Sequence, residues 1–160
     1  MKKIEKLYRS NYVGEDVITN MTYTGGSWEY SREKISNGIT NNQISNKAII
    51  IGNGTSRLGM NLNLIKNHRG GLLASGALQS YGCNALYRDF SPNFLVATGD
   101  DIVKEIADSG YADDNIVYAS AYDILDYPGK FYLIPQDPGW NAGTIATYMA
   151  CFDGHEKVYL

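Results

Sequence analysis

The chain has 160 residues, of which 44% are hydrophobic and 19% charged, an ordinary composition for one globular domain. Its net charge of −3 and pI of about 5.3 offer no basic surface for nucleic acid, and its apolar runs are too short for a membrane-spanning helix. Cys83 and Cys151 lie in apolar stretches without a spaced framework, so we expect reduced core thiols and a cytoplasmic protein.

Residues 1–46 differ in composition from the rest of the chain. They hold few branched aliphatic side chains and many Asn, Thr, Ser, Gly and Tyr residues. Gly25-Gly26, between Tyr- and Thr-rich flanks, predicts the tip of a short hairpin, and the polar residues 37–46 predict a linker. We therefore expect an irregular N-terminal arm, ordered by packing on the main domain or on a second subunit of a homo-oligomer.

Strand patterns begin at Lys47. Residues 48–51 form a continuous apolar run ended by Gly52, which is typical of a strand buried on both faces, central in a sheet and parallel to its neighbours. Further strands are predicted at 78–83, 94–98, 115–119, 131–134 and 157–160.

Helical patterns lie between these strands. Residues 101–109 fit a helix capped by Asp100 or Asp101 and stopped by Gly110, and residues 144–152 have apolar side chains at helical spacing. The apolar residues of 58–68 fit either the helical or the strand period. The alternation predicts an α/β, Rossmann-like three-layer sandwich with a mostly parallel sheet over residues 47–160. The last residues form an apolar strand that stops without a polar tail, so we expect the domain to continue in a longer protein.

The loop after the first buried strand is the strongest candidate for a binding site. Two glycines allow close backbone approach, successive N–H groups can point at an anion, and Thr55, Ser56 and Arg57 add donors. The alternative is a plain tight turn, because the loop is neither a Walker A motif nor a full Gly-x-Gly-x-x-Gly. The residues of this candidate site are Gly52, Asn53, Gly54, Thr55, Ser56 and Arg57.

Polar residues also follow the later strands, at the edge where open α/β sheets bind ligands. Asn84 is expected to bind a ligand or to brace a neighbouring loop. Asp100 and Asp101 would hold ribose hydroxyls or Mg²⁺, or cap a helix. Asn141, Gly143 and Thr144 open the last helix, as a second anion site or as a cap. We expect all these groups to converge on one cleft.

Other catalytic chemistry has little support in the sequence. His68 and His155 are isolated and are expected at the surface, and no Cys, His or Asp cluster has metal-ligand spacing. A Gly-x-Ser-x-Gly nucleophile motif is also absent from the sequence. The catalytic residues are therefore not identified.

Three segments in order suggest a family: 50–56, then 82–87, then Asn141-Ala142-Gly143 through 156–160. This pattern resembles bacterial sialyltransferases, motility-associated-factor glycosyltransferases and 6-hydroxymethylpterin pyrophosphokinases. The resemblance covers residues 47–160 and implies that the Gly52 to Ser56 loop cradles nucleotide phosphates. It also implies that Asn84 and the turn at 141–144 bind the nucleotide or sugar. Thr55, Arg57 and Ala142 depart from the family pattern, and the family's catalytic histidine would lie beyond Leu160.

The resemblance implies a nucleotide-sugar-binding, glycosyltransferase-like domain whose full-length form transfers a sugar to an acceptor hydroxyl. A second hypothesis is a pyrophosphokinase-like enzyme that uses ATP and Mg²⁺ through Asp100 and Asp101. A third is a non-catalytic ligand-binding or assembly protein whose Tyr-rich N-terminal arm makes the contacts. A divalent-metal requirement separates the second hypothesis from the first. A deep pocket at the Gly52 loop favours the first two hypotheses, and a filled one favours the third.

Overall fold

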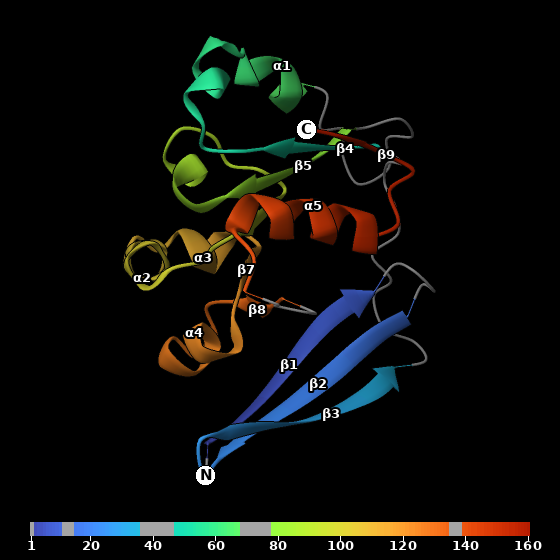
Figure 1. Cartoon of the computed structure of the whole chain (residues 1–160), viewed down its shortest axis with the longest axis vertical. Helices are drawn as coiled ribbons and strands as arrows, with labels where there is room; N and C mark the ends of the chain where they lie inside the picture. Colours follow the sequence, from blue (N-terminus) through green and yellow to red (C-terminus); the bar gives the residue numbers. More distant parts are fainter. Residues whose placement is uncertain (1, 11–14, 36–46, 68–77, 135–138) are drawn as a thin grey trace.

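The computed structural model describes residues 2–10, 15–35, 47–67, 78–134 and 139–160. Six parallel strands form the main sheet, in the order β8-β7-β6-β5-β4-β9 (Figure 1). The strands are β4 (Lys47–Ile51), β5 (Leu78–Cys83), β6 (Phe94–Val96), β7 (Val117–Ala119), β8 (Tyr132–Leu133) and β9 (Lys157–Tyr159). The predicted parallel α/β class is thus confirmed, and β4 lies inside the sheet between β5 and β9.

Helices cover both faces of this sheet and make three layers. They are α1 (Leu62–Asn67), α2 (Asp100–Asp108), α3 (Tyr111–Asp114), α4 (Ala121–Asp126) and α5 (Ala142–Phe152), with short 3-10 helices η1 (Thr55–Gly59) and η2 (Asn84–Arg88). Alternate strand residues point to opposite faces. Leu95 packs in the cluster formed with α1 to α4, whereas Phe94 and Val96 pack against α5. The two clusters are the two halves of one α/β core.

The helix ends follow recognisable local signals, with one correction. Gly110 ends α2 with a positive φ of 77°, as predicted. However, the N-cap of α2 is Gly99, and no side chain caps it, so the predicted cap by Asp100 or Asp101 is wrong. The two carboxylates instead occupy the first turn, where the helix dipole favours negative charge.

Helix α5 begins two residues earlier than predicted. Asn141 is its N-cap, and its Oδ1 accepts a hydrogen bond from the Thr144 N–H at 3.0 Å. Ile145 and Met149 are fully buried, as their spacing predicts. Buried alanines complete the stripe, and these carry too little apolar surface to stand out in a sequence pattern.

The N-terminal residues are more regular than expected. They form an antiparallel sheet of β1 (Lys2–Ser10), β2 (Glu15–Thr24) and β3 (Ser27–Ile35) instead of an irregular arm. The hairpin at Gly25-Gly26 is confirmed, with φ of 62° and 89° at the two glycines. Strand β1 runs beside β8 and α4 (Figure 1). Thr and Tyr favour strands even where aliphatic residues are as few as they are in these three segments, which explains the difference. The predicted linker at 37–46 lies outside the described residues.

A buried polar cluster joins β5 to the end of α5. The Tyr81 hydroxyl donates to Asp153 Oδ2 at 2.5 Å and lies 3.1 Å from His155 Nε2. All three residues are buried. The prediction that His155 is a surface residue is therefore wrong, because a polar side chain can be buried when neighbouring segments supply partners. His68 lies outside the described residues.

Tyr81→Phe is expected to lower the free energy of unfolding by about 1.5–3 kcal/mol, because it deprives a buried carboxyl side chain of a hydrogen bond. Urea denaturation measures this difference. Tyr159→Phe is the matched control, because the Tyr159 side chain is about half exposed. Equal stability of the two variants would show that the Tyr81–Asp153 hydrogen bond contributes nothing.

Candidate functional site

The connections around β4 create a topological switch point. From β4 the chain passes through η1 and α1 to β5 on one side, whereas α5, on the opposite face, leads to β9 on the other side. The strand order therefore reverses between β4 and β9, and open α/β sheets bind ligands at the carboxyl edge beside such a reversal. The loop that begins at Gly52 lies at this point.

A hollow of about 200 Å³ is present there, and we name it the switch hollow. Its lining is Ile50, Ile51, Gly52, Gly54, Ser56, Arg57, Met60 and Leu160. The Asn53 side chain does not line it, because Asn53 Nδ2 donates to the Cys83 carbonyl at 2.7 Å and fastens the loop to β5. Burial raises the pKa of the Cys83 thiol at the end of that strand.

The glycines of this loop are not required by the unliganded fold. Gly54 has an ordinary φ of −62°, and Gly52 is not among the positive-φ glycines. A Cβ atom at Gly52 would meet no atom within 4 Å, and one at Gly54 would meet only Ser56 Oγ at 3.5 Å. A glycine that served only a tight turn would show a positive φ or a crowded Cβ position. The need for a tight turn therefore does not explain why Gly52 and Gly54 are glycines.

Arg57 brings a guanidinium group to the switch hollow. Its Nη2 donates to Asp89 Oδ2 at 2.7 Å, and its side chain is 16% exposed. Its Nε is buried and has no hydrogen-bond partner among the described residues. A buried guanidinium N–H without a partner is costly, so a ligand or water that accepts from it would be stabilised. Within the described chain, the N–H groups of Gly54, Thr55 and Ser56 also donate to no other residue.

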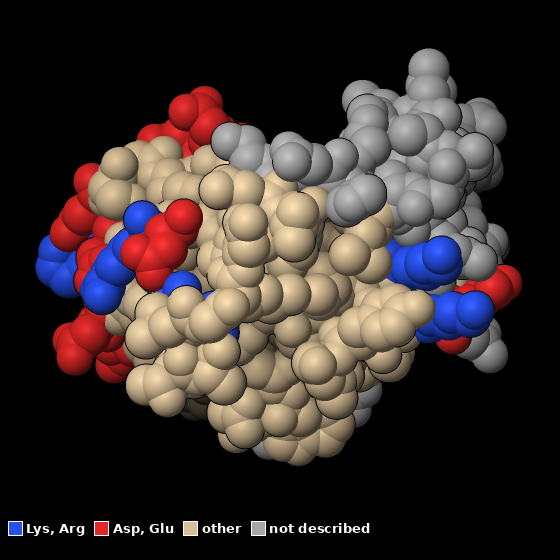
Figure 2. Space-filling model, turned by 90° about the horizontal axis from the view of Figure 1, so that it is seen from above, with Lys and Arg blue, Asp and Glu red and all other residues tan. Residues whose placement is uncertain are grey.

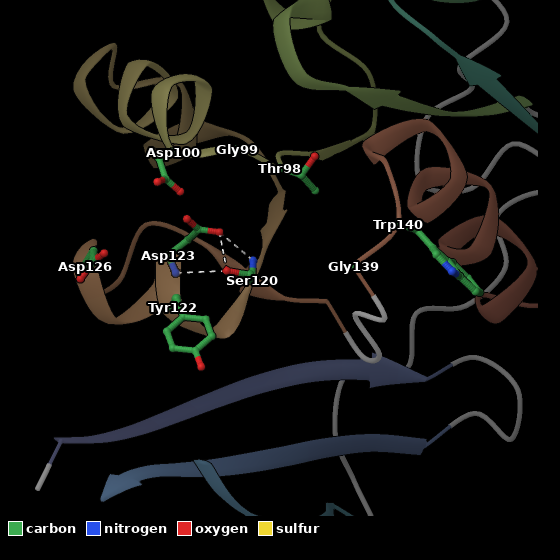
Figure 3. Close-up of a pocket in the computed structure, with 9 residues that line it drawn as sticks. All are labelled: Thr98, Gly99, Asp100, Ser120, Tyr122, Asp123, Asp126, Gly139 and Trp140. Atoms are coloured by element: carbon green, nitrogen blue, oxygen red, sulfur yellow. Dashed lines mark hydrogen bonds between the residues drawn. The ribbon is translucent and has the colours of Figure 1, made fainter. Parts of the chain in front are cut away.

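A second hollow, of about 450 Å³, lies farther along the carboxyl edge, and we name it the acidic hollow (Figure 3). Its lining is Thr98, Gly99, Asp100, Ser120, Tyr122, Asp123, Asp126, Gly139 and Trp140. Asp100 and Asp123 point toward one another from the starts of α2 and α4. Asp123 Oδ2 accepts from the Ser120 N–H at 3.0 Å as part of a capping box, and it also accepts from Ser120 Oγ at 2.6 Å. Three carboxylates without a basic side chain favour hydroxyl groups or cations over phosphate.

The remaining predicted residues have structural partners. Asn84 has a positive φ of 47°, and its Oδ1 accepts from the Thr98 N–H at 2.9 Å, so it braces the next loop. Asn141, Gly143 and Thr144 line a third hollow, on the outer side of α5. Cys151 lines it too and is exposed, which corrects its expected place in the core.

The predicted residues thus share the carboxyl edge but do not form one cleft. The Gly52 loop lines the switch hollow, Asp100 lines the acidic hollow, and the start of α5 lines the third hollow. Four residues beside these hollows were not predicted from the sequence: Asp89, Ser120, Asp123 and Asp126. The Ser-x-x-Asp spacing before α4 is a capping signal that could have revealed two of them. No sequence signal links Asp89 to Arg57.

Comparisons with protein-family models, curated proteins and solved structures return no match for this chain. Within the described residues, no group of three or more His, Cys, Asp or Glu side chains is arranged to hold a metal ion. None of the described helices combines the length and apolar character needed to cross a membrane.

Proposed function

We propose that this chain binds the phosphate of a nucleotide or nucleotide-sugar in the switch hollow. The observation that carries the proposal is a Gly-x-Gly loop at a topological switch point whose glycines leave open space where side chains would stand. Gly54, Thr55 and Ser56 would contribute N–H groups, and Arg57 would contribute a charge-assisted hydrogen bond.

The distribution of charge along the chain supports an anion at this end. Residues 34–88 contain no Asp or Glu, although the whole chain has a net charge of −3. Asp89, the carboxylate nearest Arg57, is already paired with it. The acidic hollow, in contrast, repels phosphate. Local charge therefore selects the Gly52 loop over the other hollows for the anionic part of a ligand.

The activity that we propose is glycosyl transfer, from the resemblance to glycosyltransferases and from this site. Backbone N–H groups and Arg57 would stabilise the phosphate that leaves a sugar donor. The acidic hollow lies two to three strands away, about 10–15 Å at the usual strand spacing. Its carboxylates would accept hydrogen bonds from sugar or ribose hydroxyls. Two free cysteines fit a reducing, cytoplasmic setting.

A thermal-shift screen with CMP, UDP, GDP and ATP, each with and without Mg²⁺, tests the proposal. A nucleotide at 100 times its Kd stabilises the fold by about 2.7 kcal/mol, which raises Tm by roughly 5–10 °C for a chain of this size. A shift by ATP that requires Mg²⁺ would favour the pyrophosphokinase hypothesis. Unchanged Tm with all four nucleotides at millimolar concentration would contradict nucleotide binding and favour the non-catalytic hypothesis.

A further inference from the structure

Two side-chain hydrogen bonds join three neighbouring strand ends at the carboxyl edge. Asn53 Nδ2, in the loop after β4, donates to the Cys83 carbonyl at the end of β5, at 2.7 Å. Asn84, the next residue, accepts through Oδ1 from the Thr98 N–H, in the loop after β6, at 2.9 Å. The parallel pairing of β4, β5 and β6 ends before the loops that hold Asn53 and Thr98. The two bonds therefore tie these loops together where the sheet itself no longer does.

Asn84 adopts a backbone conformation that few residue types tolerate. Its φ is 47°, and it is the one non-glycine residue with a positive φ within the described part of the chain. A left-handed backbone crowds the Cβ atom, and Gly, Asn and Asp tolerate it best. Such a conformation persists where the surrounding contacts enforce it. Asn84 thus meets two requirements at once, a left-handed backbone and a side-chain acceptor for the next loop, and glycine would meet only the first.

The two bonds lead from one hollow to the other. Asn53 belongs to the loop that lines the switch hollow, whereas Thr98 and Asp100 line the acidic hollow. Within the described chain, the Thr98 N–H has no acceptor other than Asn84 Oδ1. Gly99, the next residue, has a φ of 102° and supplies no side-chain cap for α2. Asn84 therefore holds the peptide group that leads into the start of α2.

Charge differs between the two hollows. Arg57 lines the switch hollow, whereas Asp100, Asp123 and Asp126 line the acidic hollow without a basic side chain. Figure 2 shows that the Asp and Glu side chains in view gather mainly at the left, the side of the molecule on which α2 lies in Figure 1. A phosphate is therefore favoured in the switch hollow, and uncharged hydroxyl groups are favoured in the acidic hollow.

We propose that Asn84 is a positioning residue that sets the separation of the two hollows for one ligand, whose phosphate binds in the switch hollow and whose hydroxyl groups bind in the acidic hollow. The inference rests on the proposed function and deepens it. Asn84 acts through the main chain of Thr98 and needs no contact with the ligand. Once one part of a molecule is bound, the other binds at high effective concentration when the two sites stand at a matching separation. A loop after β6 without its tie would bind each part singly but would seldom bind both at once.

Asn84→Gly tests the inference, because glycine adopts a positive φ and lacks the side-chain acceptor. Two ligand series are titrated by calorimetry: pyrophosphate, UDP or GDP, and UDP-glucose or GDP-glucose; and phosphate, CMP and CMP-sialic acid. The first member of each series occupies only the switch hollow. The variant is expected to bind this member within about twofold of the wild-type affinity and to bind the later members roughly 10- to 100-fold more weakly. A loss that begins at the nucleotide identifies ribose as the hydroxyl-bearing part, and a loss confined to the conjugate identifies the sugar.

Two further variants separate positioning from a general loss of stability. Asn84→Asp retains an acceptor oxygen and tolerates a positive φ, so it is expected to keep the wild-type ratio of affinities within each series. Its added charge acts on the phosphate of every member and therefore largely cancels in the ratio. Asn115→Gly is the matched control, because Asn115 Nδ2 donates to the Tyr111 carbonyl at 2.9 Å just before β7, at the opposite edge of the sheet. This control should also leave the ratio unchanged.

The outcomes distinguish failure of the inference from failure of the proposed function. Equal weakening of every member in Asn84→Gly, or no weakening of any, would overturn the inference while wild-type binding of nucleotides leaves the proposed function standing. A ratio that changes as much in Asn115→Gly would overturn it too. A changed ratio in Asn84→Asp would do the same, so the inference stays testable even where Asn84→Gly does not fold. Wild-type protein that binds no member of either series would instead reject the proposed function.

Discussion

Gly82→Ala is expected to lower the free energy of unfolding by about 3 kcal/mol, at the upper end of overpacking costs. A Cβ atom at Gly82 would stand 2.4 Å from Leu86 Cδ2 and 2.9 Å from Pro92 Cγ. Leu86 is fully buried, and the proline ring cannot rotate away. The clash would force η2 away from β5 at the carboxyl edge. Chemical denaturation measures the loss.

The same substitution at Gly52 provides the control. No atom lies within 4 Å of a Cβ at Gly52, so Gly52→Ala is expected to be neutral or to stabilise the fold by up to about 1 kcal/mol. Gly52 follows β4, and Gly82 lies in the neighbouring strand β5 opposite Ile51, yet only Gly82 is a packing glycine. Equal destabilisation of both variants would contradict the distinction between a glycine kept for packing and one left open for a ligand.

The fold could be predicted from the sequence where the apolar pattern was unambiguous. The apolar run that ends at Ile51 can bury its side chains on both sides only inside a sheet covered on both faces, and β4 lies there. The Gly25-Gly26 turn was equally decisive, because it requires two positive φ values. The turn predicted a short hairpin, but β1 and the full length of β2 and β3 were missed, because Thr, Tyr and charged residues outnumber the aliphatic residues there.

The site could be predicted only as far as the carboxyl edge. Parallel strands bring all their ends to one edge, so the placement of Gly52, Asn84 and Asp100 there follows from the strand pattern. Which of these residues remain available to a ligand depends on pairing between distant loops. Asn84 Oδ1 accepts a hydrogen bond from the Thr98 N–H, and Arg57 Nη2 donates one to Asp89 Oδ2. Neither contact has a local sequence signature. Side-chain availability is therefore a tertiary property.

Gly54→Ala is expected to abolish nucleotide binding without loss of stability. Its φ of −62° suits any residue, and the space at its Cβ position is open in the unliganded protein. A methyl group there would stand where the phosphate must approach the backbone. The free energy of unfolding should stay unchanged or rise by up to about 1 kcal/mol, because alanine restricts the unfolded chain. Calorimetric titration, with the nucleotide that gives the largest thermal shift, measures the affinity.

Arg57→Ala is expected to weaken the same binding by about 1.5–3 kcal/mol, roughly 10- to 150-fold, through loss of a charge-assisted hydrogen bond. Asp89→Ala separates recognition from positioning. Asp89 is 55% exposed and holds Arg57 through one ion pair, so its removal frees the guanidinium and should preserve or strengthen binding. An equal loss of affinity in Arg57→Ala and Asp89→Ala would show that the ion pair acts by positioning the loop. Unchanged affinity in Gly54→Ala and Arg57→Ala would move the ligand, if one binds, away from the switch hollow.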